Sequence, residues 1–287
     1  MLFKKSKKVL ADKRIVVFGG AGSIGSELVR QLAPKNKVYV VDINESGIFD
    51  LVDEIGSKEV WGRVGDIRNY QTVRDIFEDF KPQIVYNCAA YKHVPLMQYT
   101  PKEAIDTNIL GNHNIIHVAK LWECVEKFVF ISTDKAVSSN SVMGASKRFG
   151  EVETLTQGKG FIVVRFGNVM GSRGSLFTIW QRQMDAGKKL TVTDENMERY
   201  MMSIPDAVSL VVKAAEEGEG GEIFILDMGM KFNILKLAQA ILLKAGKNPG
   251  EHIDLTGIRP GETLVENLMF EEEKHRAIKR DNFIIIK

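Results

Sequence analysis

The sequence predicts an α/β fold in which helices cover both faces of a doubly wound, mainly parallel sheet. Two observations predict it. Short runs rich in Val and Ile alternate with segments of helical period over the first 170 residues, and these runs are apolar throughout instead of at every second position. Strands of this kind are buried on both faces, and right-handed crossovers then place helices on either side of the sheet.

The first elements follow that alternation in order. The strand-like runs are RIVVF (14–18), KVYVVD (37–42), IVYNC (84–88), FVFIS (128–132) and FIVVRF (161–166), with a third strand expected just before VGDIRN. Segments with a period near 3.6 lie between them: SIGSELVRQLA, ESGIFDLVDEI, TVRDIFEDF and AIDTNILGNHNIIHVAKLW. In such a sheet the ligand lies beyond the carboxyl ends of the strands.

The pattern changes after about residue 170 into a mixture of short strands and helices. We expect strands in LTVTD, EIFIL, HIDLT and FIIIK, and helices in LFTIWQRQMDAG, PDAVSLVVKAAEEG and NILKLAQAILLKAG. This mixture predicts a smaller mixed α/β portion that faces the substrate.

Composition excludes several classes of function. The chain has 287 residues, and its 39 Lys and Arg nearly balance its 37 Asp and Glu, so no overall field points to nucleic acid or an anionic membrane. Cys88 and Cys124 lack metal-ligand spacing, and we expect no metal. No apolar run approaches a membrane span. Residues 1–13 are expected to form a basic tail, and the protein to be cytoplasmic, without membrane insertion.

A glycine-rich turn follows the first strand. Gly19, Gly22 and Gly25 recur three apart, with Ser23 and Ile24 between the last two. Glycines there permit a tight turn, let backbone N–H groups approach a pyrophosphate and allow a helix to pack closely on the strand. The sequence therefore predicts a Rossmann-like dinucleotide site, and residues 14–170 are expected to form the NAD-binding domain, with residues 171–287 mainly binding substrate and the chain interleaving between the two.

Acidic residues end the next two strands. Asp42 is placed to accept both ribose hydroxyls, which favours NAD over NADP because a carboxylate repels a 2′-phosphate. Asp66 and Ile67 are placed to meet the adenine. The alternative for the glycine turn and Asp42 is a purely structural turn, and the alternative for Asp66 is a helix N-cap.

The spacing G-x-x-G-x-x-G resembles the extended branch of the short-chain dehydrogenase/reductase superfamily. NCAA at 87–90 resembles its cofactor-lining segment, which assigns Ala89 and Ala90 to the cofactor, and Asn108 matches its structural asparagine or is simply a helix-bending polar residue. Met143 and Lys147 lie one above the other on a helix. The resemblance implies that Lys147 holds the nicotinamide ribose, whereas Met143 stands where the superfamily has a catalytic tyrosine.

A second reactive cluster ends the fifth strand. Thr133, Asp134 and Lys135 supply a hydroxyl, a carboxylate and an amine near the expected nicotinamide. Neighbouring acid and base groups perturb each other's pKa, a frequent property of acid/base sites. The alternative is a helix cap followed by a surface lysine.

Longer motifs resemble one group, the UDP-N-acetylglucosamine 4,6-dehydratases of the CapD-like polysaccharide-biosynthesis proteins, in a short soluble form with methionine for tyrosine. They are GSIGSEL, AAYKHVPLM, STDKAV, MGASKR, RFGNVMGSRGS, ERYMMSIPDAV, GEIFILDMG and IRPGE. The resemblance implies an internal redox reaction: NAD takes hydride from sugar C4, water is eliminated across C5 and C6, and hydride returns to C6. It implies Lys135 as the base at C5, Asp134 as the acid at the C6 hydroxyl and Thr133 as the relay for the C4 hydroxyl proton.

The same motifs imply the substrate contacts, and a homo-oligomer is usual for the superfamily. The residues expected to bind a UDP-N-acetylhexosamine are Lys92, His93, Asn168, Arg173, Ser175, Arg199, Arg259 and Glu262. Two other functions remain open, namely a UDP-sugar C4 or C5 epimerase and a sugar-nucleotide-binding scaffold without turnover. A solvated surface is the alternative for each arginine taken alone.

Overall fold

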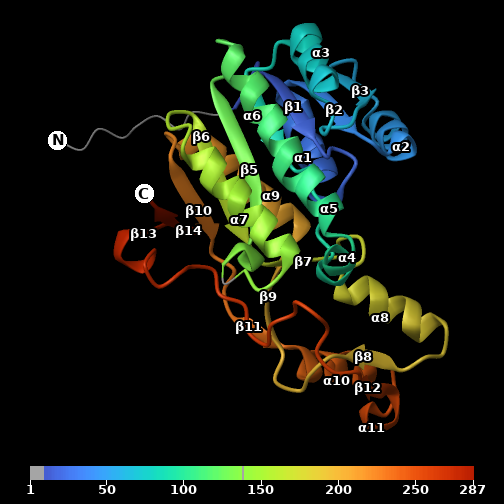
Figure 1. Ribbon diagram of the computed structural model, residues 1–287. Coiled ribbons are helices and arrows are strands. Elements are labelled where there is room, and N and C mark those ends of the chain that lie inside the picture. The colour runs from blue at the N-terminus through green and yellow to red at the C-terminus, as the bar shows by residue number, and fades with distance from the viewer. Residues whose placement is uncertain (1–9, 138) are drawn as a thin grey trace.

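The computed structural model describes residues 10–137 and 139–287, so the predicted basic tail lies mostly outside the described residues. A nine-stranded sheet forms the centre of the molecule, in the order β13-β14-β10-β6-β5-β4-β1-β2-β3 (Figure 1). The strands are β1 (Arg14–Phe18), β2 (Lys37–Asp42), β3 (Val60–Val64), β4 (Ile84–Asn87), β5 (Lys127–Thr133), β6 (Phe161–Phe166), β10 (Glu222–Leu226), β13 (Ala277–Arg280) and β14 (Phe283–Ile286).

The order in which the strands are added to the sheet changes direction at β1. Strands β2 and β3 extend the sheet on one side of β1, whereas β4, β5 and β6 extend it on the other, and all these pairings are parallel. Such a switch point leaves a crevice at the carboxyl ends of β1 and β4, where open α/β sheets bind ligands. Only the far edge departs from the parallel arrangement, because β14 pairs antiparallel with both β10 and β13.

Helices cover both faces of the sheet, as the continuous apolar strands predict. One face carries α1 (Ser23–Leu32), α2 (Glu45–Ile55) and α9 (Ile204–Glu217), whose buried residues share one apolar cluster with the strands. The other carries α3 (Tyr70–Phe80), α6 (Asn112–Leu121) and α7 (Val142–Leu155). This three-layer arrangement confirms the predicted fold class.

A smaller lobe lies beside the sheet, at the bottom right of Figure 1. It contains α8 (Leu176–Asp185), β8 (Leu190–Val192), α10 (Ile234–Lys244), α11 (Pro249–His252) and β12 (Ile253–Leu255), and it packs around its own core, which includes buried Trp180. A three-stranded sheet of β7 (Asn168–Met170), β9 (Glu198–Ser203) and β11 (Lys231–Asn233) lies between the lobe and the main sheet. The chain beyond residue 170 contributes to both parts, because α9, β10, β13 and β14 belong to the large one.

The remaining helical segments are short. They are η1 (Ala33–Lys35), α4 (Val94–Tyr99), α5 (Pro101–Ala104), the π-helical η2 (Ile105–Gly111), η3 (Asp134–Ala136) and η4 (Lys274–Arg276). The strands β7, β9, β11 and β13 and the helix α4 were not predicted from sequence. None of the helices that the described residues form is long and apolar enough to cross a membrane.

Candidate active site

A cavity of about 770 Å³ opens at the carboxyl ends of β1, β4, β5 and β6 and extends to the smaller lobe. Most of the residues predicted from sequence line it. They are Gly19, Gly22, Ser23, Ile24, Gly25, Ala90, Lys92, His93, Thr133, Asp134, Lys135, Met143, Lys147, Asn168, Arg173, Ser175, Arg199, Arg259 and Glu262. Four predicted cofactor residues lie outside its lining: Asp42, Asp66, Ile67 and Ala89.

The glycine turn forms a cradle that side chains would fill. Gly19 has φ +74°, and a Cβ built on it would lie 2.6 Å from the backbone nitrogen of Ala89. A Cβ on Gly25 would lie 2.2 Å from the carbonyl oxygen of Gly19. Gly22 is the N-cap of α1 and provides no side-chain cap, and the first turn of α1 is free of acidic residues. This helix end therefore fits the pyrophosphate of a dinucleotide.

The side chains of Asp42 and Asp66 bind neighbouring protein groups. Asp42 accepts hydrogen bonds from the backbone nitrogens of Ala21 and Asn44, both at 3.0 Å, so it links the glycine turn to the end of β2. Asp66 pairs with Arg68 at 2.7 Å. The N-cap of α3 is Asn69, which excludes the alternative that Asp66 caps this helix.

Ile67 is 5% exposed, and its side chain packs in the apolar core instead of lining the cavity. A Cβ on Gly111 would lie 2.5 Å from the Ile67 side chain. Asn108, in the adjacent π-helix, accepts from the backbone nitrogen of Tyr91 at 2.8 Å and donates to the carbonyl oxygen of Tyr91 at 3.0 Å. This arrangement gives Asn108 a structural role, because it holds the backbone of Tyr91, which lines the cavity.

Met143 and Lys147 both face the cavity from α7. The Nζ of Lys147 lies 3.9 Å from the centroid of the Phe130 ring. Burial lowers the pKa of Lys147 to about 8, against the raising effect of charge on Cys88 and Glu151. Met143 is 2% exposed and packs with Met97 and Ala104. A thioether has no ionisable proton, so acid/base chemistry must come from elsewhere in the cavity.

The tip of β5 supplies that chemistry. Lys135 Nζ lies 3.0 Å from Asp134 Oδ1 and 3.1 Å from Asn168 Oδ1, and the hydroxyl of Thr133 donates to Asp134 Oδ1 at 2.9 Å. Burial alone would raise the pKa of Asp134, but the charge of Lys135 and three hydrogen bonds outweigh burial and lower it. Burial alone would lower the pKa of Lys135, but the negative charges of Asp134 and Glu266 outweigh burial and raise it. The free protein therefore holds an ammonium–carboxylate pair.

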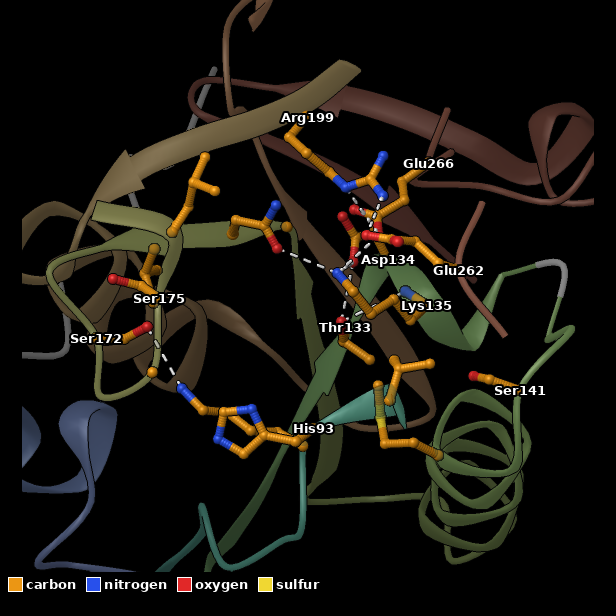
Figure 2. A pocket seen from close by; sticks show the side chains of 18 of the residues that line it. His93, Thr133, Asp134, Lys135, Ser141, Ser172, Ser175, Arg199, Glu262 and Glu266 are labelled. Atoms are coloured by element: carbon orange, nitrogen blue, oxygen red, sulfur yellow. Dashed lines mark hydrogen bonds and ion pairs between the residues drawn. The ribbon is translucent and has the colours of Figure 1, made fainter. Parts of the chain in front are cut away.

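Glu266 completes this cluster, and sequence analysis did not identify it (Figure 2). Its Oε1 lies 2.9 Å from Lys135 Nζ and 3.3 Å from Arg199 Nε. Burial raises the pKa of Glu266 to about 7, with Lys135 opposing and Asp134 reinforcing that shift. Ser172 was also not predicted, although its hydroxyl accepts from Lys92 Nζ at 3.3 Å.

Arg199 departs from its predicted role. Its guanidinium is buried and donates to the carbonyl oxygens of three residues, Glu198, Thr263 and Leu264, besides its contact with Glu266. These protein acceptors occupy the donors that a phosphate would need, so the geometry argues against the predicted phosphate contact. Glu262, like Glu266, binds an arginine: its Oε1 lies 3.0 Å from Arg259. The side chain of Arg259 is more than half exposed.

The cationic side chains of Lys92, Arg173 and Arg259 line the cavity together with His93. Burial lowers the pKa of Lys92, and the charges of Lys135 and Arg173 lower it further. Burial and the charges of Lys92 and Arg259 also lower the pKa of His93. The backbone nitrogen of Arg173 donates to Ser23 Oγ at 3.0 Å, so this loop touches the glycine turn. Such a field suits a diphosphate.

Ser175 precedes α8 as its N-cap, at the far wall of the cavity. Among the described residues, no group of three or more His, Cys, Asp or Glu side chains is arranged to hold a metal ion. Chemically, the cavity offers a dinucleotide cradle, a cationic wall and a buried group of acid and base side chains in one enclosed space.

Comparison with known proteins identifies similar sequences. A family model described as polysaccharide biosynthesis protein matches residues 15–287. The chain is 42% identical over 93% of its length to the capsular polysaccharide biosynthesis protein CapD of Staphylococcus aureus, and 34% identical over 96% of its length to a UDP-glucose 4-epimerase of Rickettsia bellii, of which it covers 83%. It spans about half of CapD, 46% of that protein.

Solved structures share the fold. Pen from Bacillus thuringiensis superposes with a TM-score of 0.90 at 34% identity, over 96% of this chain and 88% of that one. A UDP-glucose 4-epimerase of Thermus thermophilus in complex with NAD gives a TM-score of 0.78 at 26% identity, over 89% and 90% of the two chains. The epimerase from Thermus thermophilus, which shares the fold of this chain, thus binds NAD.

Proposed function

Because the chain belongs to the polysaccharide biosynthesis protein family, we propose that it is an NAD-dependent 4,6-dehydratase of UDP-N-acetylglucosamine that yields a UDP-4-keto-6-deoxy-N-acetylhexosamine. One observation carries the proposal: Asp134 and Lys135 form an ion pair at 3.0 Å beside Thr133, in the same cavity as the glycine cradle. Elimination of water needs a base that acts at one carbon of the sugar and an acid that acts at the hydroxyl of the adjacent carbon. This pair supplies one group for each role.

Bound NAD would supply the oxidation, by accepting hydride from C4 and returning it to C6. The side chains move the protons. The hydroxyl of Thr133 already donates to Asp134 at 2.9 Å, which supports a relay of the C4 hydroxyl proton through Thr133. Asp134, protonated through that relay, then gives its proton to the departing C6 hydroxyl, and Lys135, acting as the free amine, removes the C5 proton and gives it back. Met143 takes no part in proton transfer, and Lys147 contributes a positive charge beside the expected nicotinamide.

The cofactor contacts follow from the cradle. Gly19, Gly22 and Gly25 would admit the pyrophosphate, with Ser23 and Ile24 beside it, and Lys147 would contact the nicotinamide ribose. Asp42 remains the proposed partner of the adenosine ribose. Lys92 and Arg173 are proposed to hold the diphosphate of the substrate.

Product analysis tests the function. Purified protein incubated with NAD and UDP-N-acetylglucosamine should give a product that has lost one water, measured by mass spectrometry and by proton NMR in heavy water. We expect Asp134→Asn and Lys135→Met each to lower turnover by about a hundredfold or more, because each removes one proton-transfer group. Asp254→Asn, at an exposed position of strand β12 outside the cavity lining, is the matched control and should turn over as the unmodified protein does. Absence of any 4-keto product would refute the proposal.

A second function has one specific observation in its favour. The relative from Rickettsia bellii is named as a UDP-glucose 4-epimerase. A C4 epimerase would use the same cofactor and nucleotide contacts without elimination, and its product would keep the C6 hydroxyl. The same NMR spectrum distinguishes the two reactions.

A further inference from the structure

Three oxygen atoms surround the amino group of Lys135 at the tip of β5. Glu266 Oε1 lies 2.9 Å, Asp134 Oδ1 3.0 Å and Asn168 Oδ1 3.1 Å from Nζ. An ammonium has three N–H donors and no acceptor, so the amide oxygen of Asn168, and not its nitrogen, faces Nζ. In the free protein, Lys135 therefore has one oxygen partner for each of its three protons.

The proposed reaction needs one of these three directions. A base must direct a lone pair at the proton that it removes, and the amine form of Lys135 has two N–H groups and one lone pair around the same nitrogen. A lone pair and an amide or carboxylate oxygen repel each other. One of the three oxygens must therefore leave before the C5 proton of the sugar can take its place.

Asn168 is the partner that is free to leave. Asp134 Oδ1 also accepts from the hydroxyl of Thr133 at 2.9 Å. Glu266 Oε1 also lies 3.3 Å from Arg199 Nε, so each carboxylate has a second group that holds it. Among the residues that the structure describes, the amino group at the β5 tip is the one hydrogen-bond partner of the Asn168 side chain. The two carboxyl residues are 1% and 5% exposed, whereas Asn168 is half-buried and lines the cavity.

The side chain of Asn168 can move while its backbone stays in place. The backbone belongs to β7, where Asn168 pairs with Met201 of β9. A Cβ on Gly167 would lie 2.9 Å from Asp134 Oδ2, so the glycine lets this strand begin close to the β5 tip. Because the Asn168 side chain lines a cavity of about 770 Å³, rotation about its side-chain torsions carries the amide away from Lys135.

We propose that Asn168 is a positioning residue whose amide covers the base Lys135 in the free protein and is displaced when the sugar nucleotide binds. This inference rests on the proposed dehydratase function. Displacement takes one acceptor from the ammonium, which favours loss of a proton, and it opens the cavity side of Nζ to C5 of the sugar.

The protons balance over the cycle. As the substrate displaces the amide, an N–H bond of Lys135 breaks and water takes up that proton. The amine then removes the C5 proton and later returns it, while Asp134 receives its own proton separately, from the C4 hydroxyl through Thr133. When the product leaves, Lys135 regains a proton from water and the oxygen of Asn168 accepts from it again.

Two substitutions of Asn168 separate this role from a direct contact with substrate. Asn168→Ala has no amide to displace, so we expect kcat within about twofold of the unmodified protein and KM lower by about threefold or more. Asn168→Asp has the same shape but places a third carboxylate at Nζ, which holds the ammonium, and kcat should fall by about tenfold or more. Asn196→Asp, at an exposed position outside the cavity lining, makes the same charge change and should keep both constants.

A rise of KM by about tenfold in Asn168→Ala would overturn the inference, because Asn168 would then hold the substrate instead of covering the base. A fall of kcat in Asn168→Ala equal to that in Asn168→Asp would overturn it as well, because both changes would then act by disturbing the site.

Protein loaded with NADH gives a readout that needs no turnover, since NADH cannot accept hydride from C4. By isothermal titration calorimetry, Asn168→Ala should bind UDP-N-acetylglucosamine about threefold or more tightly than the unmodified protein does. In a crystal structure of the same complex, the Asn168 amide should have left Lys135 Nζ, and an amide oxygen still within hydrogen-bond distance would overturn the inference. Failure of the unmodified protein to form product would overturn the function instead, and this structure would still report whether the bound sugar nucleotide displaces Asn168.

Discussion

Lys147 shows at the scale of one residue how burial tunes a site. It is 6% exposed, and burial lowers its pKa to about 8, whereas an unfolded lysine titrates near 10.4. Between these values the unfolded chain binds more protons than the folded one, so stability rises with pH in that window. The buried positive charge of Lys147, which is proposed to act on the nicotinamide ribose, therefore lowers the free energy of unfolding.

Lys147→Met should abolish this dependence. From pH 8 to pH 10.5, we expect the free energy of unfolding of the unmodified protein to rise by up to about 3 kcal/mol relative to the variant. Urea unfolding without NAD, followed by circular dichroism at several pH values, measures the difference. Lys120→Met, at an exposed position of α6, serves as control, and parallel curves for the unmodified protein and Lys147→Met would contradict the argument.

At the scale of elements, the contact between the glycine turn and α1 sets the shape of the dinucleotide cradle. A Cβ on Gly25 would lie 2.2 Å from the carbonyl oxygen of Gly19, a distance that forces the helix away from the turn. The turn is fixed from the other side by Asp42, which accepts from the backbone nitrogen of Ala21. Displacement of α1 therefore moves its N-terminal N–H groups out of reach of a pyrophosphate.

Gly25→Ala should lower NAD affinity by at least about tenfold, or about 1.4 kcal/mol, as measured by isothermal titration calorimetry. Gly250→Ala provides the comparison, since a Cβ there meets only the Asn248 side chain at 3.5 Å, an ordinary contact. Equal NAD affinity in the two variants would show that the close approach of α1 does not shape the cofactor site.

At the scale of the whole molecule, one buried arginine joins the C-terminal segment to the sheet. Arg165 on β6 is fully buried and binds Glu151 of α7 at 2.8 Å and Glu273 at 2.7 Å. Burial opposes ionisation of Glu273, but Arg165 outweighs burial and lowers the pKa of Glu273. A group with a lowered pKa stabilises the fold above its unfolded pKa, and this contribution is lost as pH falls through the folded pKa.

Glu273→Gln should lower the free energy of unfolding at pH 7 by about 3 kcal/mol, because it leaves the buried arginine with one carboxylate fewer. The difference from the unmodified protein should begin to shrink below about pH 4, where this glutamate becomes protonated in the unfolded chain, and should be lost as pH falls through the lowered pKa of folded Glu273. Chemical unfolding at both pH values measures it, with Glu271→Gln at an exposed neighbour as control. A constant difference at pH 7 and pH 3.5 would exclude the ionic explanation.

Local patterns in the sequence accounted for most of the main sheet. Strands β1, β2 and β6 begin and end where their apolar runs predict, and the run at 84–88 differs from β4 by one residue. Residues 127 and 133 extend the predicted fifth strand at its two ends. The strands β7, β9 and β11 escaped prediction. Strands β7 and β11 have three residues each and carry little pattern of their own, and β9, with six residues, pairs with both of them.

The sequence by itself determined the doubly wound core, the glycine cradle and the neighbours Thr133, Asp134 and Lys135, because these depend on apolar runs and spacings within a few residues. Only the tertiary structure placed Glu266 beside Lys135, turned Arg199 toward carbonyl oxygens and brought β10 and β14 into the large sheet. The reason is physical: the charge state of a buried carboxyl depends on which distant groups surround it, and no spacing in the chain encodes that environment.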